Sequence, residues 1–102
     1  MRVVKPSRVR EYAALYPDAA SSLLAWLRIA KRGRWRSIPE VRAQLPSADA
    51  AKVASGRIVT IFNIGGNKYR LIVSIHYPWS MLYVLRFVTH AEYDKNAWKE
   101  TL

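Results

Sequence analysis

The sequence predicts an α+β fold in which helices come first and a small antiparallel sheet follows. In the first half, apolar residues recur at helical spacing; in the second half, three runs rich in Val, Ile, Tyr and Phe are separated by short turns. Helices followed by strands are typical of folds with helices packed on one sheet face. Because 102 residues suffice for one core, we expect a single domain over residues 1–102.

The first elements are a short strand and two helices. Residues 1–5 are expected to form a strand that Pro6 ends, which would add a fourth strand to the sheet. Ser7 is a suitable N-cap for a helix that runs to Tyr16. Asp18 can cap a second and clearer helix, which Gly33 ends.

A third, short helix follows. Ser37 and Glu40 have the spacing of a capping box at its start, and Pro46 stops it. The alanine-rich residues 47–55 are compatible with a helical turn or a loop.

Three strands are then expected to form an antiparallel meander. Gly65-Gly66-Asn67 suits a tight hairpin with positive φ angles, and Pro78-Trp79-Ser80 suits a second turn. The expected strands are Arg57–Ile64, Tyr69–Tyr77 and Met81–Thr89. Residues 90–102 are expected to contain one short helix.

Alternation along these strands sorts their side chains between two faces. In the middle strand, the odd-numbered residues from Tyr69 to Tyr77 are expected to form core, whereas Arg70 lies on the other face. In the last strand, the even-numbered and the odd-numbered residues are both mostly apolar. Strict alternation would place Arg86 and His90 on one face, where both are candidates for function.

The composition favours an anionic partner. There are 17 Lys and Arg residues against 7 Asp and Glu residues, a net charge of +10, and arginine is the commoner cation. Guanidinium groups hold phosphates with a planar fork of donors, so nucleic acid, or an acidic protein that masks the charge, is the expected partner. Five cations fall within residues 28–36, including Arg34 and Arg36 on either side of Trp35. This segment is either a solvated helix end or a phosphate-binding rim.

The composition also excludes several classes of site. With no cysteine and two histidines, neither a disulfide framework nor a structural zinc site is expected, and no cofactor is implied. The chain has neither an apolar run fit for a signal peptide nor one of about 20 residues fit for a membrane span. A cytoplasmic protein without a membrane partner is therefore expected.

Two clusters of polar side chains carry the chemistry. At the first hairpin, Lys68 and Arg70 could project two cations from one face toward a phosphate, or form a charged pair on a solvated sheet. The second cluster begins with His90, whose unperturbed pKa of about 6.5 suits proton transfer, although a lone histidine more often satisfies a local hydrogen bond. If a helix begins there, Tyr93 lies at i+3 from His90 and can face the same ligand, while Asp94 points elsewhere.

These two blocks resemble HigB-type toxins, messenger-RNA endonucleases of the RelE-like group in type II toxin-antitoxin systems. The matching segments are Phe62-Asn-Ile-Gly-Gly-Asn67, Arg70, and Thr89-His-Ala-Glu-Tyr-Asp94. The resemblance implies a RelE-like α+β mRNA interferase that cleaves translated mRNA at the ribosome without a metal ion. It also implies a cognate HigA-like antitoxin with a helix-turn-helix domain.

For the site, the resemblance implies catalytic and RNA-binding roles for particular residues. Arg70 and Lys68 would hold the scissile phosphate and His90 would move a proton. Tyr93 would stack on a base or transfer a proton, and Glu92 is a rival base. Asn67 is a further candidate for RNA contact, or serves only to shape the hairpin. The charge and placement of other residues, rather than the resemblance, add expected RNA contacts at Arg86, Arg34, Arg36 and Trp35.

Two other readings stay open at the level of sequence. One is a non-catalytic RNA-binding module, in which cations grip phosphates while Trp35, Trp79 and Tyr93 stack on bases. The other is a small basic subunit whose charge an acidic protein neutralises.

Overall fold

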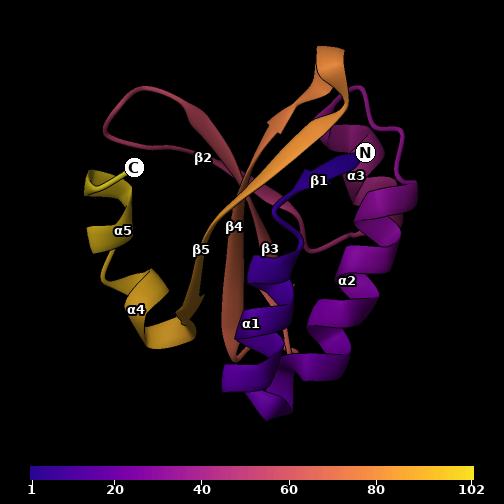
Figure 1. The fold of residues 1–102 in the computed structure, drawn as a ribbon. Coiled ribbons are helices and arrows are strands. Elements are labelled where there is room, and N and C mark those ends of the chain that lie inside the picture. The colour runs from indigo at the N-terminus through magenta and orange to yellow at the C-terminus, as the bar shows by residue number, and fades with distance from the viewer.

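A five-stranded sheet with the order β1-β5-β4-β3-β2 forms the centre of the computed structural model, which describes all 102 residues (Figure 1). The short strand β1 pairs with β5 in parallel, and all other neighbours are antiparallel. The strands are β1 (Arg2–Val4), β2 (Asp49–Lys52), β3 (Ile58–Ile64), β4 (Tyr69–His76) and β5 (Met81–Thr89). The expected meander is therefore present as β3, β4 and β5, and the N-terminal strand joins it.

Both turns of the meander contain residues with positive φ angles. Gly65 and Gly66 have φ angles of +63° and +68°, which glycine adopts without a steric cost between β3 and β4. Between β4 and β5, the 3₁₀ turn η2 (Tyr77–Trp79) ends at Ser80, which is left-handed with φ of +50°.

The strand β2 was not expected, because residues 47–55 were predicted to be a helical turn or a loop. Asp49 pairs with Ile61 and Lys52 with Ile58, so the segment adds an edge strand to β3. Its alanines have little strand preference of their own. The exposed hydrogen-bonding edge of β3 decides its conformation.

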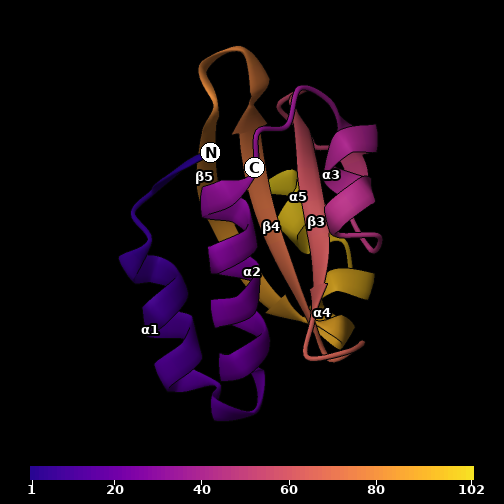
Figure 2. The ribbon, with the colours of Figure 1, turned by 90° about the vertical axis from the view of Figure 1, so that its right-hand side faces the viewer.

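The N-terminal helices cover one face of the sheet, as expected. They are α1 (Ser7–Leu15), the 3₁₀ helix η1 (Pro17–Ala19), α2 (Ala20–Arg32) and α3 (Ile38–Gln44). Figure 2 shows α1 and α2 side by side. The larger core lies beneath them and includes Leu23 and Leu27 from α2, Val41 from α3, and Phe62 and Leu71 from the sheet. None of the helices is long and apolar enough to cross a membrane.

The caps differ from the predictions. Pro6 is the N-cap of α1 and Ser7 is its first residue, and the N-cap residue Ser37 makes no side-chain hydrogen bond to α3. Asp18 lies within η1 and caps nothing; its carboxylate accepts a hydrogen bond from the Tyr69 hydroxyl at 2.9 Å. At Asp18 a tertiary partner thus takes the place of the expected cap.

Two short C-terminal helices cover the opposite face, where a single helix was expected. They are α4 (His90–Asp94) and α5 (Ala97–Glu100), and Figure 1 shows them across the sheet from α2. Asn96, with a left-handed φ of +61°, separates them. A second, smaller core lies under them and contains Val53, Val59, Ile61, Ile72, Val88 and Trp98.

An irregularity in β5 changes which of its side chains share a face. Ile72 pairs with Arg86, but the next residue of β4, Val73, pairs with Val84, so Leu85 is an extra residue of β5. Val84 therefore belongs to the larger core while Val88 belongs to the smaller one. Strict alternation along this strand would place Val84 and Val88 on the same face, so the expectation of strict alternation is wrong, and the bulge is the reason.

Candidate functional site

A cluster of polar side chains forms where the β3–β4 hairpin meets the junction of β5 and α4. Arg70, near the start of β4, pairs with Val88, near the end of β5. The amide of His90 donates a hydrogen bond to the carbonyl of Lys68 at 2.8 Å. These backbone contacts bring the two sequence blocks to the same end of the sheet.

Arg70 is the centre of the cluster. Only 8% of this residue is exposed. Its Nη2 donates to Oδ1 of Asn67 at 2.7 Å, and its Nη1 donates to the carbonyls of Asn67 and Tyr69 at 3.3 and 3.1 Å. The guanidinium carbon lies 5.3 Å from the centre of the Tyr93 ring. These contacts hold the guanidinium in a fixed orientation. Because no carboxylate pairs with it, this cation can still attract a phosphate.

His90 lies between Arg70 and Asp94. Its Nδ1 is 3.4 Å from Nη2 of Arg70, and its Nε2 is 3.6 Å from Oδ2 of Asp94. A guanidinium can only donate, so Nδ1 must be the acceptor and the proton of the neutral ring lies on Nε2, toward the carboxylate. The expectation that Asp94 points elsewhere is wrong, because residues at i and i+4 share one side of α4.

Tyr93 packs beside Arg70 and against Trp98. Its ring stacks on the Trp98 indole with centres 5.3 Å apart and an interplanar angle of 16°. Burial raises the pKa of the Tyr93 phenol above its usual 10, the negative charges of Asp49 and Asp94 raise it further, and Arg70 opposes them. The hydroxyl is therefore protonated at neutral pH and can act as a donor.

Glu92 and Thr89 form a capping box at the start of α4. The Glu92 amide donates to Oγ1 of Thr89 at 3.2 Å, and Oε1 of Glu92 accepts from the Thr89 amide at 3.1 Å. The Thr-x-x-Glu spacing in the sequence is the signal for this cap. One carboxylate oxygen thus fixes the helix that carries His90, and the role of Glu92 as a base stays a prediction.

Lys68 does not share a face with Arg70, so that expectation is wrong. It precedes β4 and lies in the turn, and its Nζ is 3.7 Å from Oδ2 of Asp18 on the side of the N-terminal helices. Both side chains are largely exposed, and such pairs contribute little to stability. A role for Lys68 at a phosphate requires its flexible side chain to leave Asp18.

The remaining predicted RNA contacts are dispersed. Arg86 donates to the carbonyl of Leu85 and to Oγ1 of Thr101. Arg34 and Arg36 are exposed beyond the end of α2. Trp35 is 2% exposed, is part of the larger core and donates from Nε1 to Gln44. Its expected contact with RNA is wrong, because the indole fills the space beside Gly33, where a Cβ atom would lie 2.7 Å from the ring.

Two residues of the site were missed from the sequence. Asp94 could have been found from its i+4 spacing to His90. Trp98, which supports Tyr93 and also donates from Nε1 to the Tyr93 carbonyl at 3.0 Å, had no signal, since nothing in the sequence places α5 under the sheet.

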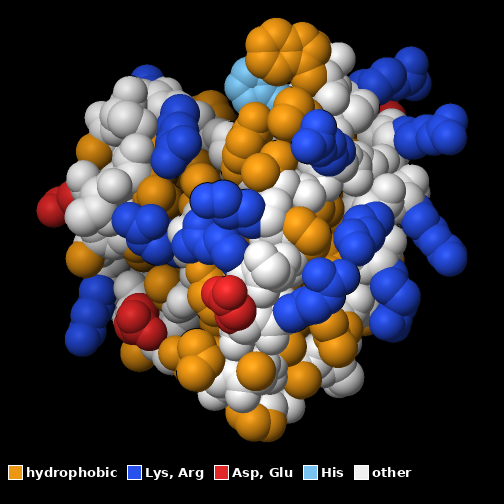
Figure 3. All heavy atoms as spheres, viewed as in Figure 1, with side chains coloured by type: hydrophobic (Ala, Val, Ile, Leu, Met, Phe, Trp, Pro, Cys, Tyr) orange, Lys and Arg blue, Asp and Glu red, His pale blue; other side chains and the backbone are white.

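The electrostatics of the surface match an anionic ligand. Figure 3 shows many Lys and Arg side chains and few acidic ones on the face that carries α1 and β5. The cluster around Arg70 supplies a buried cation, a histidine and a protonated phenol. Together they can hold a phosphate and move protons beside it.

Comparison with known proteins identifies similar chains. Residues 19–96 match the family model HigB_toxin, described as the RelE-like toxic component of a toxin-antitoxin system. The mRNA interferase toxin HigB of Escherichia coli strain K12 is 27% identical over 94 residues, which cover 92% of this chain and 88% of that protein. The mRNA interferase HigB of Escherichia coli O6:H1 is 30% identical over 95 residues, which cover 93% and 90%.

Proposed function

Because the chain belongs to the HigB family of RelE-like toxic components of toxin-antitoxin systems, we propose that it is an endoribonuclease that cleaves messenger RNA. The observation that carries the proposal is the contact of Arg70 with both His90 and Tyr93 in one cluster. These three side chains provide the groups that RNA cleavage needs. Relatives named mRNA interferases support the same substrate class.

The proposed reaction is attack of a ribose 2′-hydroxyl on the adjacent phosphate. A base removes the 2′ proton, the 2′-oxygen forms a bond to phosphorus, and the bond to the 5′-oxygen breaks as that oxygen gains a proton. The products are a 2′,3′-cyclic phosphate and a 5′-hydroxyl. We assign Arg70 to the developing negative charge on the phosphate, where a preorganised cation has its largest effect. The reaction as proposed uses no metal ion.

Proton transfer is assigned to His90 and Tyr93. Nδ1 of His90 accepts from Arg70 in the free protein, so a phosphate that takes over this guanidinium donor leaves Nδ1 ready to accept the 2′ proton. Asp94 would stabilise the imidazolium that forms. The Tyr93 hydroxyl is the proposed acid for the 5′-oxygen, consistent with the direction of its pKa shift.

We further propose that the protein acts in the cytoplasm on translated mRNA at the ribosome and is inhibited by a HigA-like helix-turn-helix antitoxin. The net charge of +10 supports contact with ribosomal RNA, with Arg34, Arg36 and Arg86 as phosphate contacts. A less basic antitoxin could mask the same charge.

The function is tested by mapping new RNA 5′ ends in bacteria that express the wild type or an Arg70→Ala, His90→Ala double variant. Growth arrest and cuts confined to translated regions, with the wild type alone, are the expected result. Cuts in untranslated RNA at equal frequency would contradict ribosome dependence. If neither folded protein produced cuts, the proposal would fail in favour of a non-catalytic RNA-binding module.

Tyr93→Phe is expected to lower the cleavage rate about 100-fold while the fold is unchanged, because it removes the proton donor and keeps the ring against Trp98. Single-turnover cleavage and thermal unfolding measure the two effects. Tyr83→Phe, at an exposed tyrosine outside the cluster, is the matched control and should cleave normally. Full activity of Tyr93→Phe would show that the Tyr93 hydroxyl is not the proton donor for the 5′-oxygen.

A further inference from the structure

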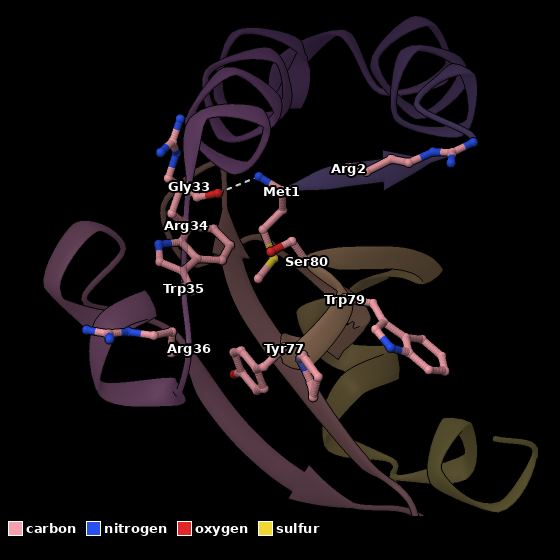
Figure 4. A pocket seen from close by; sticks show the side chains of 10 residues that line it. Met1, Arg2, Gly33, Arg34, Trp35, Arg36, Tyr77, Trp79 and Ser80 are labelled. Carbon is pink, nitrogen blue, oxygen red and sulfur yellow. Dashed lines mark hydrogen bonds between the residues drawn. The ribbon is translucent and has the colours of Figure 1, made fainter.

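A second candidate site lies at the far end of the sheet from Arg70. A hollow of about 750 Å³ opens there between the start of β1, residues 33–36 after α2, and η2 with Ser80 (Figure 4). Tyr77, which follows β4 at this end, lies seven positions after Arg70, a span of about 23 Å at about 3.3 Å per residue. A group bound in the hollow therefore cannot touch the Arg70 cluster.

The rim of the hollow is cationic. Its lining includes Arg2, Arg34 and Arg36 and contains no carboxylate. Arg2 and Arg34 make neither an ion pair nor a side-chain hydrogen bond, and Arg36 has only an exposed pair with Glu40. In Figure 4, Arg34 and Arg36 lie on one side of the hollow and Arg2 on the other, and all three side chains extend outward from its rim. Uncompensated guanidinium groups on both sides favour an extended anion that crosses the hollow.

An exposed aromatic ring stands at the same rim. Trp79 is 71% exposed, whereas the other three tryptophans are at most 5% exposed. One face of its indole stacks on His76, with ring centres 5.1 Å apart and an interplanar angle of 13°. The other face is open to a ligand. The position of the ring is fixed by the 3₁₀ turn that contains Pro78 and by the left-handed Ser80.

We propose that this hollow binds a segment of unpaired RNA, with phosphates on Arg2 and Arg34 and a base stacked on Trp79. Phosphates beside a free aromatic face are the combination that single-stranded nucleic acid uses, whereas an acidic peptide would use the charges and leave the indole without a role. The inference rests on the proposed RNA substrate. It adds an anchoring site, which acts on RNA binding and takes no part in the chemistry.

The test uses the fluorescence of Trp79, the one exposed tryptophan. A short 2′-O-methylated oligouridine, which has no free 2′-hydroxyl to attack, is titrated into the wild-type protein. Quenching and protection from acrylamide are expected, and both signals should be absent in Trp79→Phe. Arg2→Ala, Arg34→Ala is expected to weaken binding at least about tenfold, because the variant loses two charge-assisted contacts to phosphate.

The controls separate this site from general electrostatics and from a protein partner. Lys5→Ala, Arg10→Ala removes the same charge from exposed positions before and on α1, and should change affinity far less. Equal weakening by both double variants would overturn the proposal. It would also be overturned if a poly-glutamate peptide, or an abasic strand of equal charge, protected Trp79 as well as the oligouridine does.

Cleavage assays then distinguish the source of the RNA. If the hollow holds the strand being cut, Arg2→Ala, Arg34→Ala raises KM for ribosomes that carry a long unstructured mRNA and not for ribosomes that carry a short one, with kcat retained. If it holds a different RNA, KM is unchanged for both substrates although the oligouridine binds weakly. A wild-type protein that shows the Trp79 signal but cleaves neither free RNA nor mRNA that is being translated on ribosomes would refute the proposed function alone; cleavage without that signal would refute the hollow alone.

Discussion

Arg70→Ala is expected to lower RNA cleavage by at least about 100-fold, the cost of removing one preorganised donor from a developing oxyanion. The fold should survive. Asn67, which loses its partner, is exposed, so water can replace the guanidinium at its Oδ1. We expect a stability loss of about 1–2 kcal/mol from the missing hydrogen bonds. Single-turnover cleavage and urea unfolding measure the two quantities.

Two further variants make this result specific. Arg70→Lys keeps the charge but lacks the planar fork that contacts Asn67 and His90 together, so it should also be strongly impaired. Arg10→Ala removes an exposed arginine from α1 and should cleave like the wild type. A folded Arg70→Ala protein with wild-type activity would remove Arg70 from the mechanism.

Trp98→Ala is expected to destabilise the protein by about 3–5 kcal/mol, the usual cost of truncating a buried large aromatic side chain. Trp98 is 5% exposed and packs in the smaller core with Ile72 and Val88. It also stacks on Tyr93 and donates to the Tyr93 carbonyl. Losing it should loosen α4 as well, so cleavage should fall even at temperatures where the sheet stays folded.

Urea unfolding, together with amide hydrogen exchange of residues 90–100, measures this effect. Trp79→Ala is the matched control, because Trp79 is exposed and its loss should change the free energy of unfolding by no more than about 0.5 kcal/mol. Equal losses in the two variants would show that α5 contributes little to the core. If amide hydrogen exchange in α4 were unchanged, the packing of Trp98 would not be what holds His90 in position.

Much of the fold was predictable because its signals are local. Gly65 and Gly66 indicate the first hairpin, and runs of β-branched and aromatic residues indicate its strands. Apolar residues at helical spacing indicate α2. The strand β2 was not predictable in this way, because its alanines pair only where β3 offers a free edge. The bulge at Leu85 depends on the register between β4 and β5, which no single strand encodes.

The candidate site was also predictable only in part. The sequence alone identified the family resemblance, the cationic character and the two blocks that contain Arg70 and His90. Tertiary structure alone placed Nη2 of Arg70 3.4 Å from His90, turned Lys68 toward Asp18, buried Trp35 and exposed Trp79. The physical reason is the distance along the chain over which each kind of interaction acts. Turn and helix preferences act over a few residues, whereas contacts between side chains twenty or more positions apart depend on strand register and on which helix covers which face.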